Sequence, residues 1–134
     1  MTDTFNDLQR SYGRCLAGRG FIERFYEIFM DSHPDVAPMF ANTDFRTQRL
    51  ALRRGISVAI LHAGGSTIVG RTCTHMAAVH GRQGRAPVPP ALYPYWVDSM
   101  LAAIAEYDPE ADEALLARWR LAMSRVVDLF SRQY

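Results

Sequence analysis

Three side chains able to take part in chemistry interrupt apolar helical patterns: His80, Gln48 and Tyr26. His80 ends a short apolar run that starts at Met76, and Gly81 follows it at once. A histidine in that position is either a packed core residue or an axial metal ligand. Gln48 is the one polar member of a long apolar stripe, and a buried amide costs free energy unless it is paired. Tyr26 can pack its ring, but its hydroxyl needs a hydrogen-bond partner.

Each of these residues has an ordinary explanation when it is taken alone. His80 would be a packed histidine, Gln48 a residue at the rim of the core, and Tyr26 a ring whose hydroxyl reaches solvent or a carbonyl. Phe40 and Tyr93 are most simply core aromatics.

Taken together, the spacing of these residues predicts that they surround a common slot. The chain runs from Gln48 to a glycine pair at 64–65, turns there, and can return so that His80 faces Gln48. The result is an apolar slot with an imidazole on one wall and two donors, Tyr26 and Gln48, on the other. A planar apolar cofactor with an axial metal site fits this slot, because haem iron is held by a proximal histidine and distal donors stabilise its ligand.

The elements that must position these residues are helices. Apolar residues at helical spacing predict helices over residues 3–16, 21–32, 44–63, 72–80 and 91–107. Thr43 or Asp44 can cap the long helix, and Asp108-Pro109-Glu110 has the composition of a helix start, so a last helix is predicted from there. Residues 33–43 and 81–89 are predicted as linkers. The β-branched segment 66–73 is predicted as a turn, because a single short strand would have no partner.

The predicted fold class is therefore all-α, with about six or seven helices. At 134 residues the chain is expected to form a single domain spanning residues 1–134, with a hydrophobic core. An apolar fraction of 49% and a charged fraction of 22% are typical of globular proteins.

Composition also limits the partners. All 15 cationic residues are arginines, scattered along the chain and matched by 14 acidic residues, and no aromatic-plus-basic patch predicts a nucleic-acid partner. No apolar run is long enough to span a bilayer, so no membrane association is expected. The N-terminus is polar and is no signal peptide, which predicts a cytoplasmic protein. Cys15 and Cys73 have neither metal-ligand spacing nor the pattern of a disulfide framework.

At this point the sequence resembles the globin family. The closest likeness is to bacterial single-domain globins and to the haem domain of flavohaemoglobins. The likeness covers about residues 5–130 and is carried, in order, by FYEIFMDSHPDVAPMF, TDFRTQRLAL, HMAAVHG, PALYPYWVDSML and EYDPEADEALLARWRLAM. The 32 residues from Gln48 to His80 are the separation that such bacterial globins use.

The resemblance implies a globin-like fold around a pocket for haem b, and it implies roles for single residues. His80 would be the proximal iron ligand, and Tyr26 and Gln48 would be the distal, ligand-binding pair. The residues that would contact the cofactor are Phe40, Leu52, Tyr93 and Val97. Arg49, Arg82 and Arg85 are candidates to bind the haem propionates only because they lie nearby in the sequence.

Tyr93 resembles the tyrosine that joins a hydrogen-bond network with the proximal histidine in flavohaemoglobins. The glutamate that completes that network has no counterpart, because this chain ends in Ser131-Arg132-Gln133-Tyr134. Strong electron donation through His80 is therefore disfavoured, and so is peroxidase-like cleavage of an O–O bond.

The function that the resemblance implies is reversible binding of O2, and also of NO and CO, at a histidine-ligated iron. It leaves open whether the protein is an enzyme, since NO dioxygenation would need a separate reductase. The alternatives are a gas-sensor subunit that acts through a partner and a cofactor-free helical interaction module. The oligomeric state is left open.

Overall fold

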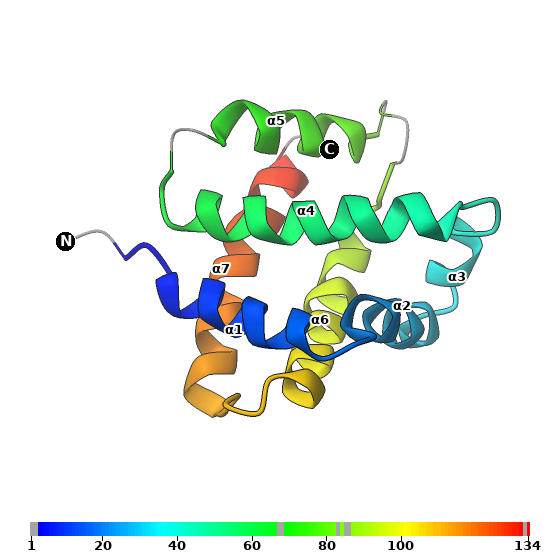
Figure 1. Ribbon diagram of the computed structural model, residues 1–134. Helices are drawn as coiled ribbons and strands as arrows, with labels where there is room; N and C mark the ends of the chain where they lie inside the picture. The colour runs from blue at the N-terminus through cyan, green and yellow to red at the C-terminus, as the bar shows by residue number, and fades with distance from the viewer. Residues whose placement is uncertain (1–2, 67–68, 83, 85–86, 133) are drawn as a thin grey trace.

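The computed structural model describes residues 3–66, 69–82, 84, 87–132 and 134, and within them every regular element is a helix (Figure 1). The prediction of an all-α chain is thus confirmed. The elements are α1 (Asn6–Ala17), α2 (Phe21–Ser32), α3 (Val36–Met39), α4 (Phe45–Ala63), α5 (Gly70–Val79), the 3-10 turn η1 (Pro90–Leu92), α6 (Tyr93–Tyr107) and α7 (Glu113–Arg132).

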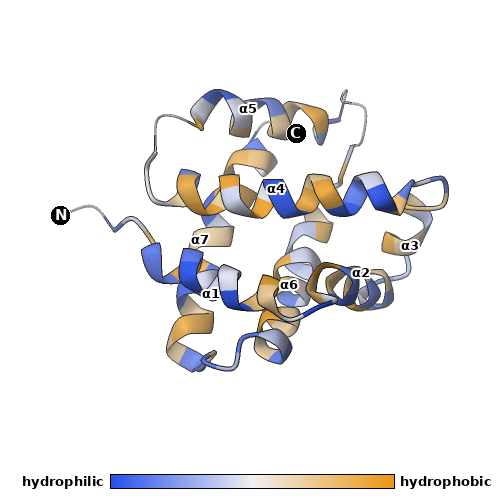
Figure 2. Cartoon of the chain, in the orientation of Figure 1, coloured by the Kyte–Doolittle hydropathy of each residue, from blue (hydrophilic) through white to orange (hydrophobic). Residues whose placement is uncertain are grey.

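The long helices cross one another around a shared core. In Figure 1, α5 lies above α4, and α1 and α2 lie below it. The most extensive helix pairings are α2 with α6, α4 with α7, and α6 with α7. The largest side chains that are fully buried include Trp119, Phe21, Phe25, Ile60 and Met100, which come from α7, α2, α4 and α6. Figure 2 shows hydrophobic and hydrophilic residues interspersed along these helices.

Helix α4 changes its degree of burial along its length. The Asp44 carboxylate caps it by accepting from the Arg46 N–H, and the helix stops before Gly64, as predicted. Ile56, Ala59, Ile60 and Ala63 in its C-terminal half are buried. The same stripe continues toward the N-terminus through three residues that stay only partly buried: Phe45, Gln48 and Leu52.

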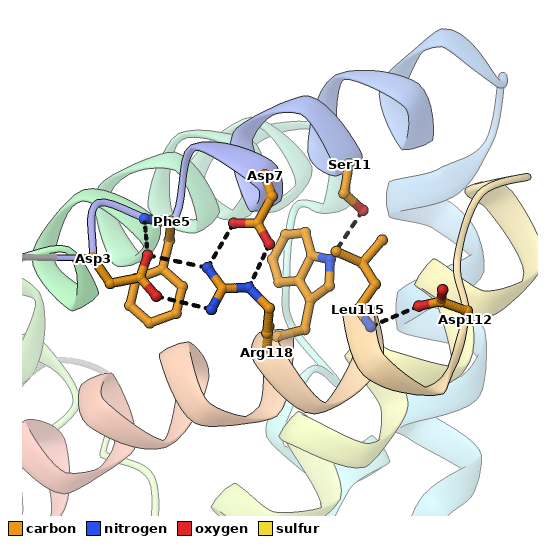
Figure 3. A network of polar contacts seen from close by, with 8 residues as sticks. Asp3, Phe5, Asp7, Ser11, Asp112, Leu115 and Arg118 are labelled. Atoms are coloured by element: carbon orange, nitrogen blue, oxygen red, sulfur yellow. Dashed lines mark hydrogen bonds and ion pairs between the residues drawn. The ribbon is translucent and has the colours of Figure 1, made fainter.

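The predicted start of the last helix at Asp108-Pro109-Glu110 is wrong. Helix α7 begins at Glu113, where the Asp112 carboxylate accepts from the Leu115 N–H at 2.8 Å (Figure 3). Asp108 is buried and binds α1, because its carboxylate accepts from Ser11 and Arg14 of that helix, both at 2.6 Å. The same carboxylate also accepts from the Glu110 N–H at 2.9 Å, so the local hydrogen bond forms, but the helix does not begin until Glu113.

The first helix starts at Asn6 rather than at residue 3. Phe5 adopts a left-handed backbone conformation with φ of 56°, which ends any helical continuation toward the N-terminus. Its ring is buried and lies 4.9 Å below the Arg118 guanidinium, which also binds Asp3 and Asp7 (Figure 3). These contacts fasten the N-terminal segment to α7.

The other boundaries differ by smaller amounts. Helix α5 covers residues 70–79 instead of 72–80, α6 is preceded by the turn η1, and the expected linker 33–43 contains the short helix α3. Part of the expected turn at 66–73 and part of the expected loop at 81–89 lie outside the described residues.

Both cysteines are buried free thiols. Among the described residues, no helix combines the length and apolarity that crossing a membrane would need.

Candidate functional site

Tyr26 and Gln48 meet between α2 and α4. The Tyr26 side chain is 4% exposed, and its hydroxyl oxygen accepts from Gln48 Nε2 at 3.0 Å. With its oxygen accepting this bond, Tyr26 keeps its own O–H to donate elsewhere. Burial raises the pKa of Tyr26 to about 12, although the hydrogen bond from Gln48 acts in the opposite direction. The phenol is therefore a protonated donor at neutral pH.

Aromatic neighbours hold the Tyr26 ring in place. Its centroid lies 5.6 Å from that of Phe40, at the end of α3, and 5.5 Å from that of Phe45 on α4, both in edge-to-face geometry. Phe25 packs against it from within α2 at 5.1 Å. Phe40, expected from the sequence to line the site, is thus brought together with the Tyr26–Gln48 pair.

His80 stands at the C-terminal end of α5 with its ring orientation fixed. Its Nδ1 lies 2.8 Å from the Met76 carbonyl oxygen. A carbonyl can only accept, so Nδ1 carries the proton in this pair and Nε2 carries the lone pair. A hydrogen bond of this kind fixes the tautomer and direction of a metal-ligating histidine.

Phe130 of α7 contacts both aromatic residues on this side of the site. Its ring centroid is 5.3 Å from that of His80 and 6.0 Å from that of Tyr93. The Tyr93 hydroxyl is buried and has no hydrogen-bond partner among the described residues, and burial raises its pKa to about 12. The expected network between Tyr93 and His80 is therefore not formed within that part of the chain. Sequence reasoning did not single out Phe130, since nothing in an apolar stripe marks one member as the neighbour of a functional histidine.

Two further residues expected at the site are apolar members of α4 and α6. Leu52 lies one turn after Gln48 on α4, and Val97 is buried on α6. Helices α4 and α5 approach closely at Gly55, where an added methyl carbon would lie 3.4 Å from Met76 Cε. Several more apolar residues of these elements and their neighbours remain only partly buried: Met39, Phe40, Phe45, Met76, Val88 and Trp96.

The contacts of the three arginines named as candidates to bind the haem propionates do not favour one over the others. Arg49 forms an ion pair with Glu23 at 3.5 Å. Arg82 is exposed, with its guanidinium 4.9 Å from the centre of the Tyr134 ring. Arg85 lies outside the described residues.

The other histidines lie in different settings. His75 is exposed on α5, and His33 accepts from the Asp35 N–H while its ring packs on Tyr95 at 4.8 Å. His62 is half-buried in the last turn of α4. Over the described ranges, no three or more His, Cys, Asp or Glu side chains gather into a metal-binding group.

The fold matches that of a known structure. A protein from Pseudomonas aeruginosa PAO1, whose crystal structure is described as structurally highly homologous to a human hemoglobin, superposes with a TM-score of 0.91. The two sequences are 32% identical, and the match covers 98% of each chain. No family model and no curated protein matched the sequence in the corresponding searches. Identity at this level over nearly the whole length shows that the chain belongs to the globin family.

Proposed function

We propose that this globin binds haem b, with His80 as the proximal ligand of the iron. The observation that carries the proposal is the hydrogen bond from His80 Nδ1 to the Met76 carbonyl, which leaves Nε2 free to bind a metal. The Tyr26–Gln48 pair supports it, because a buried, protonated phenol is suited to hydrogen-bond a small ligand. The family to which the chain belongs favours the same cofactor.

Apolar residues of the surrounding helices would hold the flat cofactor. Phe40, Leu52 and Val97 supply apolar surface, and the partly buried stripe at the start of α4 is the kind of surface that an apolar ligand covers. The buried Tyr93 hydroxyl, unpaired within the described residues, would gain a partner if a polar edge of the ligand approached it.

When bound, the haem supplies an iron at which O2, NO or CO binds reversibly. The protein's own contribution is then to retain that ligand. Tyr26 donates its O–H, and Gln48 keeps the phenol oxygen in position. Slow release of O2 follows from two polar groups on the distal side, and it suits NO dioxygenation with a separate reductase better than bulk oxygen transport.

Absorbance of the purified protein tests this proposal. The wild-type protein, expressed with haem or reconstituted with it, is expected to show a strong Soret band, and His80→Ala is expected to remove iron ligation by histidine. His75→Ala is the matched control, because His75 lies on the same helix but is exposed. A colourless protein that takes up no added haem would refute the proposal and favour a cofactor-free helical module.

A further inference from the structure

The overall charge balance conceals a strong separation of charge along the chain. The 53 residues from 45 to 97 contain seven arginines and no aspartate or glutamate, whereas the rest contains eight arginines and all fourteen acids. The first group carries a formal charge of +7 and the second −6, which together give the net charge of +1. The arginines are therefore not evenly scattered, contrary to the expectation from composition. The basic segment includes α4 and α5, the helices that carry Gln48 and His80.

The exposed side of α4 concentrates this charge. It presents Arg46, Leu50, Arg53, Arg54 and Leu61, and these five residues are called the outer face of α4 from here on. Their spacing of four, three, one and seven residues keeps them on one side of a helix. Figure 2 shows strongly hydrophilic and hydrophobic residues alternating along α4.

Among the described residues, the arginines of this face form no ion pair with an acidic side chain. Within the described part of the chain, Arg49 is the arginine of α4 that forms an ion pair, and its partner is Glu23 of α2. The nearest acid in sequence, Asp44, caps the helix through backbone and hydroxyl hydrogen bonds. Arg46, Arg53 and Arg54 are exposed to solvent. Their charge is thus available to an external partner.

Two leucines on the same face indicate what kind of partner it is. Leu50 is 61% exposed and Leu61 is 40% exposed, and they are two of the four large hydrophobic residues that stand out on the surface of the described chain. A nucleic acid binds arginines through its phosphates and gains little from isolated leucines. Arginine combined with apolar side chains is the composition of protein–protein interfaces.

We propose that the outer face of α4 docks an acidic electron-transfer protein that carries a flavin or an iron–sulfur centre. The inference rests on the proposed haem function, because a haem globin that turns over O2 and NO needs a reductant. In the step concerned, one electron leaves the reduced centre of the partner and reduces ferric to ferrous iron, and no bond is made or broken. A partner on this face would be separated from Gln48, on the inner side of α4, by about 10 Å, the thickness of one helix.

Titration with an acidic flavodoxin tests the docking face directly. Binding to the haem-loaded protein is measured by calorimetry at about 10 mM and at about 300 mM salt, where screening removes most surface electrostatics. Wild-type protein is expected to bind at low salt and to weaken strongly at high salt. The double variant Arg53→Glu/Arg54→Glu is expected to lose at least about tenfold in affinity at low salt. Leu50→Ser is expected to weaken binding without changing its salt dependence.

A second double variant controls for net charge. Arg19→Glu/Arg120→Glu changes the formal charge by the same amount on exposed residues outside the 45–97 segment, and its affinity is expected to stay within about threefold of wild type. Equal losses in both double variants would refute a localised face. Absence of flavodoxin binding would also refute it, as would tighter binding of a short DNA duplex or phosphatidylglycerol vesicles through Arg53 and Arg54.

Haem content separates the failure of this inference from failure of the proposed function. The Soret band is recorded for every sample, and apoprotein is titrated in parallel. If the protein takes up no haem, the proposed function fails whatever the titration shows. If haem is bound and flavodoxin does not bind, the docking proposal alone fails.

Discussion

Removing one hydroxyl group from Tyr26 isolates the distal hydrogen bond from the rest of the site. Tyr26→Phe keeps the ring that packs edge-to-face on Phe40 and Phe45, so the aromatic wall should survive the change. What is lost is the donor that Tyr26 retains after its oxygen accepts from Gln48. The variant therefore tests ligand retention without a large change in packing.

The size of the effect follows from burial. The Tyr26 side chain is 4% exposed, so water does not readily replace its O–H. A hydrogen bond to a partly charged acceptor contributes about 1.5–3 kcal/mol. We therefore expect O2 to dissociate from Tyr26→Phe about 10–100 times faster than from the wild type, at about 1.4 kcal/mol per factor of ten.

Gln48 provides the second arm of a double-mutant cycle. Gln48→Leu removes the donor to the Tyr26 oxygen but leaves the phenol in place, and is expected to speed O2 release less, by about threefold to tenfold. In Tyr26→Phe the Gln48 amide loses its recorded partner and can turn toward the ligand. The two changes should therefore couple, and the double variant should differ from the product of the single effects.

The assay is stopped-flow displacement of O2 by CO, with haem content and thermal unfolding measured on the same samples. Because burial raises the pKa of Tyr26 to about 12, the wild-type dissociation rate is expected to stay constant from about pH 6 to about pH 10. An unchanged dissociation rate in Tyr26→Phe would show that the phenol does not reach the ligand, and the distal assignment would fail.

Three further predictions concern stability. Gly64→Ala is expected to destabilise the fold by about 1–3 kcal/mol in chemical denaturation, because the new carbon would lie 2.8 Å from the Thr4 carbonyl oxygen. Gly13→Ala in the exposed middle of α1 meets nothing within 4 Å and should instead stabilise by about 0.5–1 kcal/mol. Asp108→Asn should cost about 2 kcal/mol at neutral pH, since hydrogen bonding to Arg14, and then Ser11, lowers the pKa of Asp108 to about 2. A carboxyl with a lowered pKa stabilises the fold above about pH 4 and loses this effect as the pH falls toward about 2. The free energy of unfolding of Asp108→Asn, measured by chemical denaturation at several pH values, should therefore fall less steeply below about pH 4 than that of the wild type. An equally steep fall in both proteins would contradict the role of Asp108.

The parts of the fold that were predicted correctly are those determined by local sequence. Helix α2 has the predicted bounds, and α4 has the predicted cap and stop, because apolar spacing, Asp44 and the glycine pair act within a few residues. The sequence also placed Tyr26 and Gln48 on one wall of the slot, but as two donors to a ligand, and the hydrogen bond between them was not predicted.

The errors came from residues whose role depends on distant partners. Asp108 has the local features of a helix cap, yet its carboxylate is held by α1, 94 and 97 residues away in sequence. Phe5 departs from the helix because its ring packs beneath Arg118 of α7. Neither contact leaves a periodic pattern in the sequence. A rule for helix caps considers local hydrogen bonds only, so it does not detect a buried ion pair between distant residues.

The hydrogen-bond partner of His80 limits the chemistry that the proposed site can support. The Met76 carbonyl is neutral, so it orients the imidazole without drawing its proton away as a carboxylate would. The Tyr93 hydroxyl, which resembles one end of a network that reaches a carboxylate, has no partner among the described residues. As an iron ligand, His80 would donate only modestly to the metal. In the proposed site the proximal side would therefore favour reversible binding over O–O cleavage, and retention of the gas would depend on Tyr26 and Gln48.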